Sequence, residues 1–135
     1  MLPKDIEGVK KHIENYDKLI TLFDMKIIGV KEGEAMVKMN VGPDHLNAAK
    51  LCHGGAIFSL ADVAFALACN SYGKTSLALE VSINYVRPAK LGEELTAYAR
   101  KLHRGSKTGL YFIEVKNQDN KPVAFLKATS FQIED

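Results

Sequence analysis

Residues 54–71 place the strongest constraint on the fold, because they predict one long helix that is apolar throughout. The segment opens with Gly54 and Gly55, and Gly73 follows its end, as is typical of a helix boundary. Its apolar residues lie on all sides of the helix, which predicts burial on every face. No other segment is apolar all round, so any sheet in this chain must bury its apolar face against this helix.

The pattern changes from helical to alternating after Ser76. Apolar side chains recur at every second position from Leu77 to Tyr85, which is a strong strand signal, and Arg87-Pro88 ends it. Similar patterns predict strands at about 26–30, 35–41, 76–85, 94–103, 109–117 and 122–133. Short turns join most of them, which favours antiparallel pairing. We therefore expect an α+β fold, in which a curved antiparallel sheet wraps around one long central helix.

The N-terminal region adds one amphipathic helix to this plan. Pro3 suits a first helical turn, and apolar residues recur at spacings of three and four from Ile6 to Phe23, which predicts a helix at about 4–22. The 135 residues, 47% apolar and 25% charged, fit a single domain spanning 1–135.

The composition of the chain limits the kinds of partner that we expect it to bind. A net charge of +2 gives no reason to expect nucleic acid, and no apolar run reaches the roughly 20 residues of a membrane span. The N-terminus has no apolar signal segment, so Cys52 and Cys69 are expected in the reducing cytoplasm. The histidines show no metal-ligand spacing with cysteines or carboxylates, so no metal site is expected. We also expect no cofactor.

The start of the apolar helix has the features of a site for a carbonyl oxygen. A helix start leaves backbone N–H groups without acceptors at the positive end of its dipole. Gly54 and Gly55 let a ligand approach that backbone closely, so an N–H here could hold an oxyanion. The two glycines alone are equally consistent with tight packing of the helix on the sheet.

Asp62 is the residue that favours a functional interpretation. It lies among apolar neighbours in the same helix, and burying a carboxylate without partners is costly. A functional carboxylate faces a cleft, whereas a structural one is bonded to a nearby backbone group or hydroxyl. At about 1.5 Å per residue, Asp62 lies about 12 Å beyond Gly54 along the helix axis. One helix cannot easily bring both groups to one carbonyl, so two antiparallel copies in a two-fold dimer are expected to share each site.

These residues carry a resemblance to a known family. The run HGGAIFSLADVAFALACNS, with Asn47 six residues before His53, resembles the PaaI branch of the hotdog-fold thioesterases. NYVRPAKLGEELTA and VAFLKATSF extend the resemblance over roughly residues 16–133. It implies hydrolysis of acyl-CoA thioesters, often with aryl-acetyl or related acyl groups, by dimers or dimers of dimers.

The resemblance also implies roles for individual residues. Gly54 would supply the oxyanion N–H, and Asp62 would be the nucleophile or general base. Asn47 and His53 would position the thioester or the attacking water. Some relatives have Thr or Ser one turn after the acid and use it to bind water, but this chain has Ala66 there.

Coenzyme A carries phosphates, so cations are expected along its groove. Arg104 and Lys107, on either side of Gly105, are the first candidates, and Arg87 is another; each is equally consistent with an ordinary solvated surface charge. Gly55 is also expected at the substrate. A Cys52–His53 catalytic pair is unfavourable, because adjacent side chains generally point apart.

We therefore expect an acyl-CoA thioesterase that uses coenzyme A only as part of its substrate. Two alternatives stay open at this point. One is a hotdog dehydratase or hydratase acting on acyl thioesters, which needs a His for proton transfer on carbon, and His53 is available. The other is a non-catalytic module that binds acyl-CoA, which would have little use for a buried Asp62.

Overall fold

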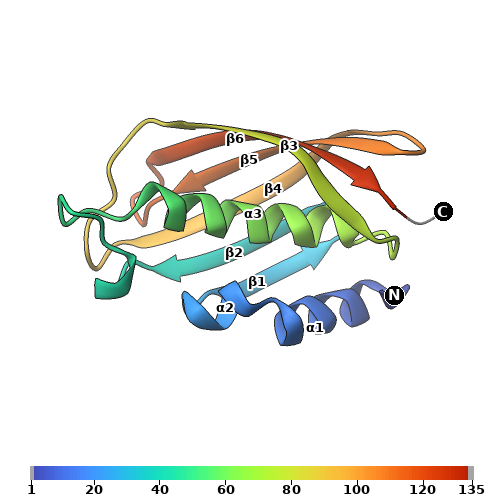
Figure 1. Ribbon diagram of the computed structural model, residues 1–135, viewed down its shortest axis with the longest axis horizontal. Helices are drawn as coiled ribbons and strands as arrows, with labels where there is room; N and C mark the ends of the chain where they lie inside the picture. Colours follow the sequence, from blue (N-terminus) through green and yellow to red (C-terminus); the bar gives the residue numbers. More distant parts are fainter. Residues whose placement is uncertain (1, 134–135) are drawn as a thin grey trace.

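A single antiparallel sheet wraps around one central helix in the computed structural model, which describes residues 2–133 (Figure 1). The central helix α3 spans Gly54–Asn70. The strands are β1 (Lys26–Lys31), β2 (Glu34–Asn40), β3 (Ser76–Tyr85), β4 (Glu94–Arg104), β5 (Thr108–Lys116) and β6 (Pro122–Gln132). They lie in the order β1-β2-β4-β5-β6-β3. This arrangement confirms the architecture that the sequence predicts.

The core lies between α3 and the inner face of the sheet. Alternate residues of β2 and β4 turn toward α3 and are buried, while those between them face outward. Several of the inward residues, such as Ala35, Ala97 and Ala99, are small, which lets the helix approach the strands closely. Larger side chains fill the centre, where the rings of Phe65 and Tyr111 meet edge to face at 5.5 Å.

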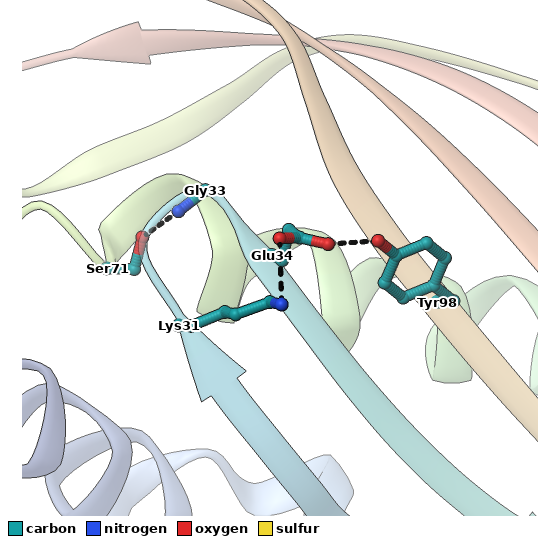
Figure 2. A network of polar contacts seen from close by, with 5 residues as sticks. All are labelled: Lys31, Gly33, Glu34, Ser71 and Tyr98. Carbon is teal, nitrogen blue, oxygen red and sulfur yellow. Dashed lines mark hydrogen bonds and ion pairs between the residues drawn. The ribbon is translucent and has the colours of Figure 1, made fainter.

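The C-terminal end of α3 is tied to two parts of the sheet. Asn70 accepts a hydrogen bond from the Ser76 N–H at 2.8 Å, which holds the start of β3 against the helix end. Ser71 donates its hydroxyl proton to Ala68 O and accepts from the Gly33 N–H at 2.8 Å, in the turn between β1 and β2 (Figure 2). Gly33 has φ +76°, a left-handed conformation that favours glycine.

A second polar network holds the outer face of the sheet together beside this turn. Lys31 forms an ion pair with Glu34 at 3.4 Å, and Glu34 accepts a hydrogen bond from the Tyr98 hydroxyl (Figure 2). These contacts connect β1, β2 and β4 on the face turned away from α3. They are therefore structural contacts outside the region around Gly54.

Strand β3 occupies an edge of the sheet, although it lies between β2 and β4 in the sequence. It pairs with β6, from Ser76 opposite Gln132 to Tyr85 opposite Ala124, while β2 and β4 pair with each other. Within residues 2–133 its other edge has no partner. Leu77 and Leu79 on this strand are 56% and 63% exposed. Apolar side chains on an open edge strand are typical of a surface that another chain covers.

The N-terminal segment forms two helices rather than the single helix expected at 4–22. Helix α1 spans Ile6–Tyr16 and α2 spans Lys18–Leu22. Asp17 has an extended backbone between them, and its carboxylate accepts a hydrogen bond from the Leu19 N–H at 3.1 Å, capping α2. The pair lies alongside α3, near β1 (Figure 1). No helix within residues 2–133 has the length and hydropathy of a membrane span.

Candidate active site

The N-terminal turn of α3 leaves one backbone donor available. His53 is the N-cap, and its Nδ1 atom accepts the N–H of Gly55 at 2.9 Å. The Gly54 N–H has no acceptor among residues 2–133. It therefore combines an open hydrogen-bond donor with the positive end of a 17-residue helix. Because Nδ1 of His53 is an acceptor, the neutral imidazole carries its proton on Nε2.

A hollow of about 400 Å³ lies beside this donor. Gly54 and Asn47 line it, and Arg87 stands at its wall. The remaining lining residues are Leu51, Cys52, Ile57, Tyr85, Val86 and Pro88. The structure thus brings together three of the residues predicted from the sequence and surrounds them with apolar side chains, as is typical of a small-molecule site.

Tyr85 is a member of this site that the sequence did not single out. Its hydroxyl donates a hydrogen bond to Gly54 O at 2.8 Å. A Cβ at Gly54 would lie 3.1 Å from the Tyr85 ring, so a larger residue would press on it. The packing explanation for Gly54 is therefore correct in part, and it coexists with the open N–H. Burial raises the pKa of Tyr85, which keeps the hydroxyl protonated as a donor.

Asn47 organises the loop that forms one wall of the hollow. Its Oδ1 atom accepts the N–H groups of Ala49 at 2.9 Å and Leu51 at 3.1 Å. Its amide nitrogen has no acceptor within the described part of the chain. The capacity that Asn47 has left for a ligand is therefore that of a hydrogen-bond donor.

Asp62 lies on the half-buried side of α3, outside the hollow. It has no hydrogen bond or ion pair to any residue in the range 2–133. Burial raises the pKa of its carboxyl group, and the negative charge of Asp17 raises it further. Asp62 and Gly54 lie at different levels of one helix. Within a single chain, the two groups therefore do not come together at one site.

The cations predicted for coenzyme A lie in two places. Arg87 borders the hollow. Arg104 lies at the opposite end of α3, with its guanidinium 3.9 Å from the centre of the Tyr72 ring and hydrogen-bonded to Gln132 Oε1 at 3.0 Å. Lys107 lies in the turn between β4 and β5. Within one chain the structure therefore does not bring Arg104 or Lys107 to Gly54.

The cysteines and histidines give no sign of a different chemistry. Burial raises the pKa of the Cys52 thiol to about 11 and that of Cys69 to about 12, so both stay protonated at neutral pH. Cys52 contacts the backbone oxygen of His53 rather than its ring. In residues 2–133, no three His, Cys, Asp or Glu side chains gather as metal ligands would.

Comparison with known proteins places the chain in a family. The family described as "Thioesterase superfamily" matches residues 49–124, which include Gly54 and Asp62. A protein of Archaeoglobus fulgidus, named only provisionally as an esterase, is 51% identical over 96% of this chain and 84% of its own length. The acyl-coenzyme A thioesterase PaaI of Escherichia coli is 47% identical over 79% of this chain and 76% of its own.

Solved structures agree with the sequence relatives. The structure of the E. coli PaaI protein, from the phenylacetic acid degradation operon, matches with a TM-score of 0.93 and 39% identity over 98% of this chain and 96% of that one. A hypothetical thioesterase of Streptococcus pneumoniae with coenzyme A matches with a TM-score of 0.79 and 29% identity, covering 82% and 90% of the two chains. The chain therefore belongs to the thioesterase superfamily and has the hotdog fold of its PaaI branch.

Proposed function

We propose that the protein hydrolyses acyl-CoA thioesters to a free acid and coenzyme A, at sites that two chains share. The observation that carries this proposal is the pair formed by the open Gly54 N–H and the unpartnered, half-buried Asp62. The name of the E. coli relative and the coenzyme A in the S. pneumoniae structure support the substrate class. The operon of the E. coli protein makes aryl-acetyl groups the first acyl groups to test.

The reaction needs an acceptor of negative charge and a base or nucleophile. The thioester carbonyl oxygen would accept the Gly54 N–H and gain negative charge there as the carbon is attacked. Asp62 of the partner either removes a proton from the attacking water or attacks the carbon itself, giving a mixed anhydride that water then cleaves. In both routes the C–S bond breaks, and the thiolate takes a proton as it leaves. No cofactor enters this scheme.

Sharing of sites between two chains would fix where the two-fold axis of the dimer lies. If Gly54 is to face Asp62 of the partner, the axis must pass beside α3 at the level midway between the two residues, near Phe58. Phe58 lies about 6 Å along the helix from Gly54, which is the length of about two strand residues. Tyr85 is hydrogen-bonded to Gly54 and so lies at the level of the helix start. Two residues back along β3, Ile83 therefore lies at the level of Phe58. We therefore propose that the β3 strands of two chains pair around Ile83.

The open edge of β3 supports this dimer, because pairing around Ile83 would satisfy the open backbone groups of residues 81–85 in both chains. Dimers of dimers belong to the same proposal. We also propose a cytoplasmic location, which the two unpaired cysteines favour. A hydratase would need His53 to transfer a proton to or from a carbon atom of the substrate. The structure does not support this role, because Nδ1 of His53 is engaged in capping α3.

Mixing two inactive variants tests the shared site. Asp62→Asn removes the acid, and Gly54→Pro removes the N–H while keeping a residue that suits the first helical position. Equal amounts of the two chains, exchanged and assayed by thiol release from phenylacetyl-CoA, should regain about a quarter of wild-type activity, because half of the dimers are mixed and carry one intact site. No recovery despite proven exchange would contradict a shared site. Hydration of crotonyl-CoA without thiol release would instead indicate a hydratase.

A further inference from the structure

The N-terminal helix pair runs along α3 in the opposite direction (Figure 1). Two contacts fix its ends. Lys4 Nζ donates to Gly73 O at 3.0 Å, beyond the C-terminal end of α3. At the other end, Phe23 O lies 3.1 Å from Nε2 of His45, whose own backbone oxygen accepts the His53 N–H at 2.7 Å.

These anchors set the level of the α1–α2 junction along α3. The stretch from Lys4 to Phe23 and the stretch from Gly73 back to His53 each contain about twenty residues, most of them helical at about 1.5 Å per residue. One residue further along the N-terminal segment therefore corresponds to about one residue back along the antiparallel α3 segment. Asp17, thirteen residues after Lys4, falls level with the turn of α3 that contains Asp62.

Asp17 is held at this level by its own contacts. It is half-buried, its extended backbone separates α1 from α2, and its Oδ1 atom caps α2 through the Leu19 N–H. Buried Val9 and Ile20 anchor the helices on either side of it. The carboxylate therefore has a fixed place beside α3 rather than on a mobile surface chain.

We propose that Asp17 is a positioning residue of the hydrolytic site, which acts by holding a second negative charge beside Asp62. The inference rests on the proposed function of Asp62. After burial, the Asp17 charge is the second cause of the raised pKa of Asp62. A more basic carboxylate takes a proton from water more readily near neutral pH and is also a stronger nucleophile. Asp17 would thus increase the reactivity of Asp62 without touching the substrate.

The other titratable groups near α3 do not supply this charge. On the inner face of the sheet they are Tyr111 and Tyr85, whose pKa values burial raises, so both are neutral. On α3 itself Cys69 is buried and protonated, and burial, followed by the charge of Asp62, raises its pKa. On α1, His12 contacts the exposed ring of Tyr16 at 4.8 Å. No cation forms an ion pair with Asp62 in the described part of the chain.

A charge-removing variant with a matched control tests the inference. Asp17→Asn keeps an oxygen that can cap α2 and removes only the charge. Asp5→Asn makes the same change at the N-cap of α1, where Asp5 accepts the Gly8 N–H at the end of α1 that lies near Gly73. In Asp17→Asn the acid limb of the kcat/KM profile for phenylacetyl-CoA should move to lower pH, and the plateau kcat should fall several-fold. Asp5→Asn should leave both unchanged.

A direct titration separates this inference from the proposed function. The Asp62 carboxyl carbon, identified by its loss in Asp62→Asn, is followed by carbon-13 NMR in the full-length protein. The pH at the midpoint of the Asp62 titration should be lower in Asp17→Asn than in wild type and in Asp5→Asn, whether or not the protein is active. An unchanged midpoint overturns the inference, and so does a lowered midpoint with an unchanged pH–rate profile. Full activity of Asp62→Asn would instead overturn the proposed function. If Asp17→Asn folds poorly, Asp17→Ser provides the same test with a capping hydroxyl.

Discussion

The hydroxyl of Tyr85 donates a hydrogen bond to the carbonyl oxygen of Gly54, at 2.8 Å, and so connects the end of β3 to the first residue of α3. This bond holds the helix start, and with it the open Gly54 N–H, in one position relative to the sheet. Tyr85→Phe keeps the ring against Gly54 and removes only the bond.

We expect kcat of Tyr85→Phe to fall about fivefold, which corresponds to the loss of about 1 kcal/mol from one hydrogen bond. Thiol release from phenylacetyl-CoA measures it. Tyr98→Phe is the control, because its hydroxyl bonds to Glu34 on the outer face of the sheet. An equal loss in both variants would mean that the effect comes from general destabilisation.

Gly54→Pro tests the oxyanion donor more directly than a bulky residue does. Proline has no N–H and suits the first position of a helix, and His53 before it has φ −60° and ψ 136°, which a following proline allows. Gly54→Ala adds a Cβ of similar placement near Tyr85 but keeps the N–H. The Pro variant should lose about 10²–10³-fold in kcat relative to the Ala variant. Equal rates in the two variants would remove Gly54 from the reaction.

Asp62→Asn should stabilise the protein at neutral pH while it abolishes most turnover. The pKa of Asp62 is raised above its ordinary value of 3.8, so the ionised form is less stable in the folded chain than in the unfolded one. Below pH 3.8 the Asp62 carboxyl group is protonated in both the folded and the unfolded chain, so it does not lower the stability of the wild type. As the pH rises through the folded pKa, the wild type loses stability, and the Asn variant does not.

The measurement is urea unfolding of both proteins from pH 3.5 to pH 8. The free-energy difference in favour of Asp62→Asn should grow with pH and disappear in acid. A difference that favours the wild type at pH 8 would mean that Asp62 has a stabilising partner in the assembled protein.

How far the sequence predicts this molecule depends on how local the signals are. The apolar positions around α3 and the alternation along β3 are local patterns, and both elements appear where they were expected. The break at Asp17 was not expected, because its capping bond to Leu19 interrupts a helix whose apolar spacing continues through it. The placement of β3 beside β6 depends on contacts between distant segments and has no local signature.

The site shows the same division. Gly54 was predicted from its residue type at a helix start, Asn47 from the family resemblance, and Arg87 as a cation for the coenzyme A phosphates. All three line one hollow. Tyr85 was missed because its contact with Gly54 crosses 31 residues of sequence. Its place on the alternating strand, on the same side as Val81 and Ile83, was the available signal. The group that Asp62 acts with lies on another chain in our proposal, so the fold of one chain cannot show it.

Cross-linking tests the proposed pairing of β3. Ile83→Cys should form an intermolecular disulfide under mild oxidation, because the two-fold axis would bring two copies of residue 83 together. Leu77→Cys, at the other end of the same exposed strand, is the control and should stay reduced. The native cysteines are both buried and give little background. Cross-linking of Leu77→Cys in preference to Ile83→Cys would contradict the register.

Three cations are expected to bind coenzyme A, and they lie in two places on the chain. Arg87 borders the hollow of its own chain, whereas Arg104 and Lys107 lie near the other end of α3. With the axis level with Phe58, the C-terminal end of α3 would lie beside the Asn47 loop of the partner. Arg87 of one chain and Arg104 and Lys107 of the other would then border the entrance to the same hollow. Arg87→Ala, and Arg104→Ala with Lys107→Ala, should each raise KM for phenylacetyl-CoA several-fold and change kcat little.

Salt and a shortened substrate separate a phosphate contact from lost packing, which matters because Arg104 also stacks on Tyr72. Exposed ion pairs are screened over about 8–10 Å at physiological ionic strength, so the wild-type KM should rise with salt and that of the variants should rise less. Phenylacetyl-pantetheine lacks the nucleotide, and its KM should be the same in wild type and variants. A raised KM for both substrates would indicate that the substitution distorts the site. If only Arg87→Ala affects acyl-CoA, then Arg104 and Lys107 are surface charges, and the entrance is formed by the chain that provides Gly54.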